Sequence, residues 1–199
     1  FYEDPDLLHR SMSNNSVMYD HRPDLPEFAA QMQLVQKNGE PGILNAEAAR
    51  KRRPWFEGVN PCSEVLLSDR GMCNLSTVNV KGHIVDGFLD HQTLMHSVRL
   101  ATRVGLRLTN VDMSLPEWDA VQKRDRLIGV SMTGWMDAVD SFDGDEIVSR
   151  FNGGVTYGES PNSLLATMRR EAEEEADAYA FEMRVPRPLL VTTVKPEGS

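Results

Sequence analysis

The sequence lacks the features that mark several large classes of protein. Cysteine occurs only twice in 199 residues. Two thiols cannot form a disulfide framework, so a reducing, cytoplasmic setting is expected. Positive charge is also scarce, because 21 Lys and Arg stand against 30 Asp and Glu, for a formal net charge of −9. An acidic chain without a large basic cluster is not expected to bind nucleic acid.

Long apolar runs are absent as well. No stretch approaches the ~20 apolar residues of a membrane-spanning helix, and the first residues do not show the pattern of a signal peptide. We therefore expect no membrane association. The chain begins at Phe1 and ends at Ser199, directly after Lys-Pro-Glu-Gly, as if a motif were cut in the middle. We expect residues 1–199 to be a fragment of a longer polypeptide, incomplete at both ends.

Helical and strand-like segments alternate along the chain. Apolar residues recur at helical spacing in three segments: 24–37, 91–110 and 160–183. Short apolar or β-branched runs predict three strands: 15–19, 77–80 and 189–194. A further helical stretch is predicted from Pro116, with a break at Gly129 and a continuation through Trp135. This alternation predicts an α/β fold with mostly parallel strands.

The most informative stretch is Asn-Pro-Cys-Ser-Glu at residues 60–64. In an extended segment, residues two apart point to the same side, so Asn60, Cys62 and Glu64 would project together. A nucleophilic thiolate needs a positive neighbour, whereas a carboxylate neighbour keeps the thiol protonated. A protonated thiol can still react by losing a hydrogen atom, and the carboxylate could act as a base on a substrate hydroxyl. Asn60 could hold a second hydroxyl, although a structural loop cysteine is also compatible with this spacing.

The second thiol, Cys73, lies ten residues beyond the first. A tight hairpin centred on Asp69 and Arg70 would place Cys73 opposite Leu66, roughly 13 Å from Cys62 along the strand. That separation exceeds the ~7 Å between Cα atoms that a disulfide allows. An irregular loop could bring the two thiols together, or Cys73 could pair with a cysteine outside this chain. The spacing fits no zinc-ligand pattern, so no metal site is expected.

Taken together, these segments resemble ribonucleotide reductases. The active-site signature of that family is N-P-C-x-E, and here it is followed by Cys-Asn-Leu at residues 73–75. The stretches SMSNNSV, NGEPGILN, RLIGVSMTGW and VTTVKPEGS resemble, in the same order, the adenosylcobalamin-dependent (class II) enzymes. The short interval between the cysteines and the KPEG sequence favour class II over class I. A class I large subunit, which needs a radical-generating partner, and a non-catalytic structural or binding module are the alternatives.

The resemblance implies a fold and residue roles. The chain would be a fragment of the catalytic barrel domain, part of the ten-stranded α/β barrel of ribonucleotide reductases. Cys62 would carry the thiyl radical that abstracts the 3′ hydrogen of a ribonucleotide. Glu64 would be the base that takes the 3′-hydroxyl proton, and Asn60 would hydrogen-bond the substrate hydroxyls. Cys73 would be one half of the redox-active dithiol, whose partner lies upstream in the family.

The resemblance also implies ligands and partners. Pro196, Glu197, Gly198 and Ser199 would bind the substrate phosphates through backbone N–H groups at a helix N-terminus. Adenosylcobalamin would be the cofactor and a ribonucleotide the substrate. An external, thioredoxin-like dithiol would be the reductant, and a nucleotide effector would bind through regions outside this chain. Two positions depart from the family pattern: Ser63 stands where glycine or alanine is common, and Ser199 where threonine is common.

Overall fold

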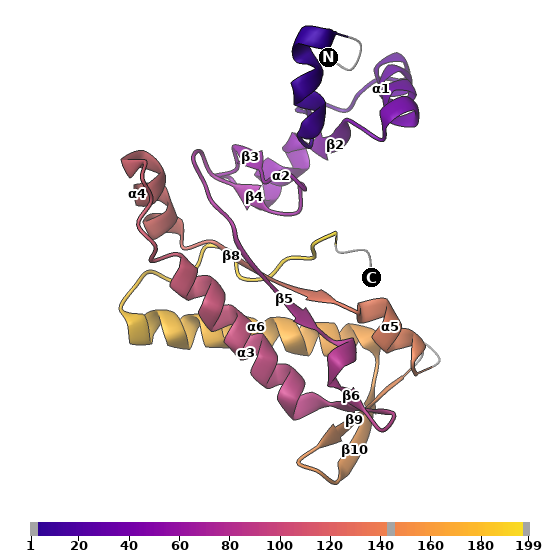
Figure 1. Cartoon of the computed structure of the whole chain (residues 1–199), viewed down its shortest axis with the longest axis vertical. Helices are drawn as coiled ribbons and strands as arrows, with labels where there is room; N and C mark the ends of the chain where they lie inside the picture. Colours follow the sequence, from indigo (N-terminus) through magenta and orange to yellow (C-terminus); the bar gives the residue numbers. More distant parts are fainter. Residues whose placement is uncertain (1–3, 143–145, 197–199) are drawn as a thin grey trace. The chain divides into compact units, whose positions relative to one another are not determined.

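The computed structural model describes residues 4–142 and 146–196 (Figure 1). The chain divides into two compact units, Phe1–Asp69 and Arg70–Ser199. Each unit contains its own cluster of buried apolar side chains. No helix among the described residues is both long and apolar enough to cross a membrane.

The first unit consists of short elements around a small core. In chain order they are η1 Pro5–Met12, β1 Ser16–Tyr19, α1 Leu25–Asn38, β2 Gly42–Asn45, α2 Ala46–Arg52, β3 Gly58–Val59 and β4 Leu66–Leu67. Strands β1 and β2 pair in parallel, whereas β3 and β4 pair antiparallel. The core cluster is formed by Ala46, Ala49 and Phe56.

Local sequence signals account for the boundaries of α1. The carboxylate of Asp24 accepts the backbone N–H of Glu27, and the Glu27 side chain accepts the backbone N–H of Asp24. This reciprocal capping provides acceptors for backbone N–H groups that have no partner within the first helical turn. At the other end Gly39 adopts a left-handed conformation with φ 73°, which glycine tolerates without steric cost. The predicted helix over 24–37 and strand over 15–19 are confirmed.

The second unit contains the longer helices. Its elements are β5 Asn74–Asn79, η2 Lys81–His83, β6 Ile84–Val85, β7 Phe88–Asp90, α3 His91–Leu108, α4 Pro116–Asp125, β8 Ile128–Thr133, α5 Trp135–Asp140, β9 Ile147–Phe151, β10 Val155–Glu159 and α6 Pro161–Met183. Strands β5 and β8 pair in parallel, and a separate sheet has the strand order β10-β9-β7-β6. Helices α3 and α6 lie side by side next to β5 and β8 (Figure 1).

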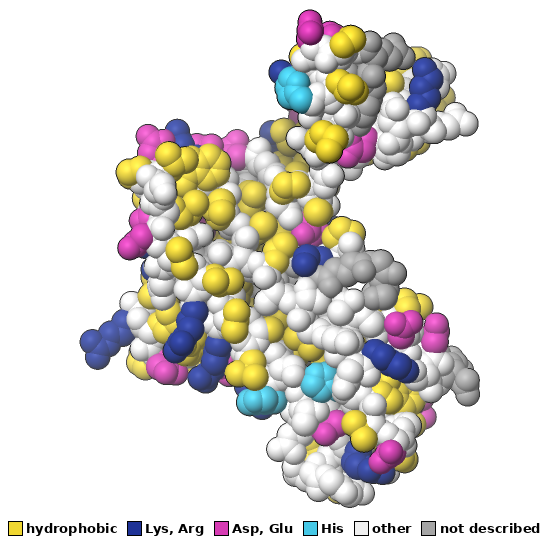
Figure 2. Space-filling model, in the orientation of Figure 1, with side chains coloured by type: hydrophobic (Ala, Val, Ile, Leu, Met, Phe, Trp, Pro, Cys, Tyr) yellow, Lys and Arg dark blue, Asp and Glu magenta, His cyan; other side chains and the backbone are white. Residues whose placement is uncertain are grey.

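Small residues and ion pairs join α3 to its neighbours. A Cβ at Gly105 would lie 3.4 Å from the Ile128 Cβ, so glycine permits the close approach of α3 to β8. Charged side chains of both signs are interspersed over the face seen in Figure 2. Some of them bridge the helices: Arg103 of α3 pairs with Glu175 of α6 at 2.5 Å. The acidic residues of α6 are therefore partly engaged by α3.

The helix predicted to run from Pro116 through a break at Gly129 is wrong in its middle part. The structure has α4, then strand β8, then the short helix α5. A Cβ at Gly129 would lie 2.5 Å from the Leu75 side chain and 2.9 Å from that of Thr193. Gly129 thus allows two neighbouring chain segments to approach β8 from both sides, and these distant partners select the strand.

The segment predicted as a strand over 189–194 follows β8 in parallel. Thr192 forms a β-bridge with Val130, and the backbone N–H of Thr193 donates to the Val130 carbonyl at 3.1 Å. Parallel pairing with intervening helices confirms the predicted α/β class. The described residues do not close into a barrel.

Candidate active site

The Asn-Pro-Cys-Ser-Glu stretch lies in the loop of a β-hairpin. Strands β3 and β4 flank it, with Val59 opposite Leu66. The Asn60 backbone N–H donates to the Val65 carbonyl at 3.2 Å, and the Asn60 side-chain oxygen accepts the Val65 N–H at 2.9 Å. Asn60 is only 5% exposed. Its amide therefore closes the hairpin loop.

The predicted hairpin centred on Asp69 and Arg70 is wrong. Strand β4 pairs backward with β3 instead of forward with the residues around Cys73. The residues after Cys73 form β5, which pairs in parallel with β8. The strand that pairs with β5 is therefore more than 50 residues away in the sequence. The hydrogen bond from the Asn74 side chain to the Leu127 carbonyl, for example, spans 53 residues.

Within the hairpin loop the backbone forms a β-turn and is not extended. The Ser63 N–H donates to the Asn60 carbonyl at 2.9 Å, which places Pro61 second in the turn, where its fixed φ is favoured. Ser63 itself is left-handed, with φ 64°. The expectation that Asn60, Cys62 and Glu64 share one side by alternation is therefore wrong, because alternation requires an extended backbone.

The three predicted residues of this loop have different environments. Asn60 is buried, Cys62 is exposed, and both carboxylate oxygens of Glu64 are shielded from solvent. The loop thus presents a thiol to the outside while it holds a carboxyl group away from bulk water two residues later. A carboxylate that is shielded from bulk water can act as a general base toward a substrate bound at this loop.

The start of β1 lies against the Cys62 loop. The Asn14 side-chain nitrogen is 3.8 Å from the Cys62 sulfur, and the Ser16 hydroxyl is 3.4 Å from that of Ser63. The side chain of Ser63 therefore faces β1. Nothing in the spacing of the sequence predicts the contact of Asn14, although it belongs to the SNNSV stretch that resembles the reductases.

The remaining predicted residues belong to the second unit. Cys73 is half-buried, directly precedes β5, and is not joined to Cys62 by a disulfide. Pro196 is exposed, whereas Glu197, Gly198 and Ser199 lie outside the described residues. Among the residues that the structure describes, no group of three or more His, Cys, Asp or Glu side chains is arranged to hold a metal ion.

The residue just before this segment is anchored on the sheet. The Lys195 backbone N–H donates to the Ser131 hydroxyl at 3.0 Å, and the Lys195 ammonium lies 3.4 Å from the Thr77 hydroxyl. Ser131 belongs to β8 and Thr77 to β5. The chain that leads to Pro196 is therefore fixed to both parallel strands.

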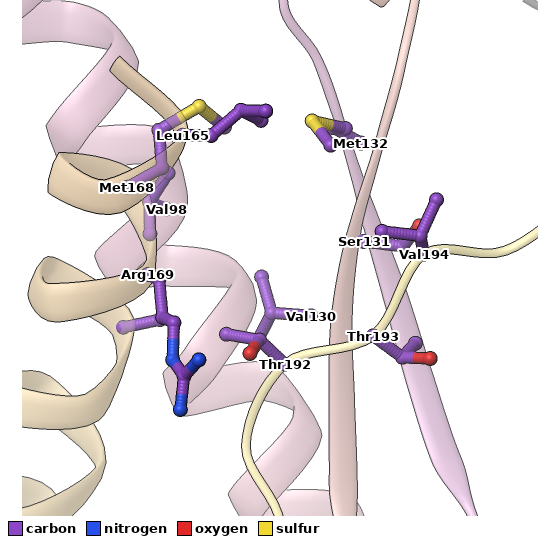
Figure 3. A pocket seen from close by; sticks show the side chains of 11 residues that line it. Val98, Val130, Ser131, Met132, Leu165, Met168, Arg169, Thr192, Thr193 and Val194 are labelled. Carbon is purple, nitrogen blue, oxygen red and sulfur yellow. The ribbon is translucent and has the colours of Figure 1, made fainter. Parts of the chain in front are cut away.

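A cavity of about 310 Å³ lies between α6 and β8 with the adjoining residues 192–194. Figure 3 shows side chains of α6 on one side and of β8 and residues 192–194 on the other, among them Leu165, Met168, Arg169, Ser131, Met132 and Val194. Its lining is mostly apolar, and none of the predicted catalytic residues contributes to it. It is therefore not the candidate catalytic site.

Comparison with known proteins identifies the family. The family described as "Ribonucleotide reductase, barrel domain" matches residues 24–141, which is more than half of the chain. The chain belongs to the ribonucleotide reductase barrel-domain family. The N-P-C-x-E loop and β5 both fall inside the matched part of this reductase domain.

Curated relatives of this reductase domain carry the class II name. The adenosylcobalamin-dependent ribonucleoside-triphosphate reductase of Lacticaseibacillus paracasei is 33% identical over 96% of this chain and 28% of its own length. The enzyme of the same name from Levilactobacillus brevis is 30% identical over 99% of this chain and 29% of its own length. The predicted resemblance to class II enzymes is confirmed. The chain spans less than a third of the length of these relatives.

A solved structure supports the fold of the reductase domain. A B12-dependent (class II) ribonucleotide reductase matches 100% of this chain and 30% of its own chain with a TM-score of 0.74. At 23% sequence identity this likeness supports the fold alone. The expected origin in a ribonucleotide reductase barrel is confirmed by the family and by this neighbour.

Proposed function

We propose that this chain is part of the catalytic barrel of an adenosylcobalamin-dependent reductase that converts ribonucleoside triphosphates to 2′-deoxyribonucleotides, within a longer polypeptide. The observation that carries the proposal is the exposed Cys62 thiol, held in a turn two residues before the buried carboxyl group of Glu64. The names of the curated relatives support the class, the cofactor and the triphosphate substrate.

The proposed chemistry divides the work between the loop and a dithiol. Cys62, as a thiyl radical, takes the 3′ hydrogen atom of the ribose. Glu64 accepts the 3′-hydroxyl proton while the 2′-hydroxyl leaves as water with a proton from the dithiol. The dithiol, of which Cys73 is one sulfur, supplies the second hydrogen and two electrons and becomes a disulfide. Cys62 then returns its hydrogen to the 3′ carbon and is again a thiyl radical, while Glu64 returns its proton to the 3′ oxygen.

The exposure of the Cys62 sulfur is compatible with a radical-generating cofactor. Adenosylcobalamin, when bound, supplies the radical that the sulfur receives. A cofactor radical can react with a thiol only if the sulfur is accessible, and Cys62 is exposed in the loop of its hairpin. Cys62 is therefore the residue of this chain that would face the cofactor.

Further groups complete the proposal. Residues 196–199 would bind the substrate phosphates, which the anchoring of Lys195 on β5 and β8 supports. Asn60 would donate a hydrogen bond from its amide nitrogen to a substrate hydroxyl, because its oxygen already accepts the Val65 N–H. An external, thioredoxin-like dithiol would reduce the disulfide, and a nucleotide effector would bind elsewhere in the complete protein.

The test is ribonucleotide reduction by the complete polypeptide that contains this segment. The assay supplies adenosylcobalamin, a dithiol and a ribonucleoside triphosphate, without a second protein subunit. Deoxynucleotide should form with the wild type and with an Asn38→Ala control at the exposed end of α1, and vanish with Cys62→Ser. Product that appears only after a metal-containing partner protein is added would move the enzyme to class I and overturn the cofactor assignment.

A further inference from the structure

Asn14 and Cys62 come together although they are 48 residues apart in the sequence. The amide nitrogen of Asn14 lies 3.8 Å from the Cys62 sulfur, within reach of an N–H···S hydrogen bond. A second contact runs beside it, because the Ser16 and Ser63 hydroxyls are 3.4 Å apart. Asn14 and Ser16, two residues apart in one segment, thus meet the adjacent residues Cys62 and Ser63 of the other.

The backbone around Asn14 is fixed independently of Cys62. The side-chain amide nitrogen of Asn15 donates to the backbone carbonyls of Arg10 and Ser13 at 3.1 and 2.6 Å. It also donates to the Glu40 carboxylate at 3.2 Å. The Asn15 carbonyl accepts the N–H of Gly42 at 2.8 Å. These bonds place Asn14 at the entry to β1, so its amide is held where it meets the thiol.

We infer that Asn14 is a positioning residue for Cys62, an assignment that rests on the proposed function. An exposed cysteine side chain can occupy several staggered rotamers. A donor on the sulfur selects one of them and directs the S–H bond away from Asn14. Hydrogen-atom transfer requires the reacting atoms to be aligned at close range, so fixing the sulfur favours the reactive geometry.

A carboxylate in place of the amide would act on the charge of the sulfur. An N–H donor stabilises the thiolate relative to the thiol, whereas a carboxylate at the same place would destabilise it. The Asn14→Asp variant has the same shape as the wild type but lacks the donor. Asn14→Ala removes the side chain beyond Cβ, and Asn14→Gln keeps an amide on a longer stem.

The experiment measures two properties of the complete polypeptide. The first is the pH profile of Cys62 alkylation by iodoacetamide, followed by mass spectrometry of the Cys62 peptide. The second is the division of any loss of reduction between kcat and KM. We expect Asn14→Ala to lower kcat roughly five- to tenfold with little change in KM, the loss of one hydrogen bond made to the reacting group.

Asn14→Asp should lower kcat at least as much as Asn14→Ala and move the alkylation profile to higher pH. Asn14→Gln should lie between Asn14→Ala and the wild type. The control Asn38→Ala should leave both properties unchanged. Because Asp matches Asn in shape, Asn14→Asp decides the question if Asn14→Ala does not fold.

Wild-type alkylation and wild-type kcat in both Asn14→Ala and Asn14→Asp would overturn the inference. An effect on thermal stability alone, with both properties unchanged, would assign Asn14 a purely structural role and also overturn it. If the complete protein shows no ribonucleotide reduction, the proposed function fails. The alkylation profile then still decides whether Asn14 acts on the Cys62 sulfur.

Discussion

The side-chain oxygen of Asn60 accepts a hydrogen bond from the backbone N–H of Val65, 2.9 Å away, across the loop that carries Cys62. The Asn60 side-chain oxygen thus stabilises the loop, whereas the nitrogen of the same amide is not used in this bond. Structural and catalytic contributions of Asn60 can therefore be separated by substitution.

Asn60→Ala should destabilise the protein. The Val65 N–H is buried, and it would lose its side-chain acceptor at a cost of about 1–3 kcal/mol. Asn60→Asp keeps the acceptor, so its urea midpoint should stay near that of the wild type while deoxynucleotide formation falls. Urea unfolding and the reductase assay check the two effects. Full activity in Asn60→Asp would show that the amide nitrogen is not needed for the substrate.

Ser63→Gly should be more stable than Ser63→Ala. Ser63 has φ 64°, a left-handed conformation that costs roughly 1–2 kcal/mol for a residue with a Cβ and nothing of that kind for glycine. Both substitutions remove the hydroxyl that meets Ser16, so the comparison isolates the backbone effect. Thermal melting of the two variants measures the difference, and equal melting temperatures would contradict it.

Gly129→Ala should destabilise the second unit. The new Cβ would lie 2.5 Å from Leu75 and 2.9 Å from Thr193, so the two segments beside β8 would have to move apart, at a typical cost of about 1–3 kcal/mol. Gly154→Ala is the matched control, because a Cβ at Gly154 would meet no atom within 4 Å. Urea unfolding followed by tryptophan fluorescence distinguishes the two variants, and similar midpoints would argue against close packing at β8.

The imidazole of His21 should titrate above its ordinary range. Hydrogen bonds to Asp20 at 3.1 Å and to Glu27 at 3.3 Å raise the pKa of His21 above 6.5. Because the folded pKa is raised, this contribution to stability is complete below pH 6.5 and is lost as the pH rises through the folded pKa.

Exchange of the His21 ring C2 hydrogen, followed by mass spectrometry across pH, reports this titration. Glu27→Gln should lower the midpoint, since it removes one carboxylate while glutamine still caps α1. An unchanged midpoint in Glu27→Gln would show that Glu27 does not contribute to the shift.

The parts of the fold that follow from local signals could be predicted from the sequence. Helix α1 has a capping aspartate and a terminal glycine, and α6 begins at Ser160 with proline at its first position. The apolar spacing of α3 predicts its buried face, where Leu94 and Val98 lie. In each case the residues that set the element lie within it or directly beside it.

The parts that depend on distant partners could not be predicted in the same way. The apolar run of β8 is too short for its periodicity to distinguish a strand from a helix, and its strand form depends on β5 and on residues near Thr192. The hairpin considered at Asp69 and Arg70 fails for the same reason, because β4 pairs with β3. The signature motif identifies Cys62 and Glu64, whereas the turn around them and the contact from Asn14 require the folded chain.

The parallel pairing of β5 with β8 has a practical consequence. Within the part of the chain that the structure describes, no strand pairs with the other side of β5. Such an edge offers a row of backbone donors and acceptors to any extended peptide that reaches it. When the 199-residue chain is produced by itself, we expect it to self-associate along this strand edge. Low solubility is then the expected first obstacle in work on the isolated chain.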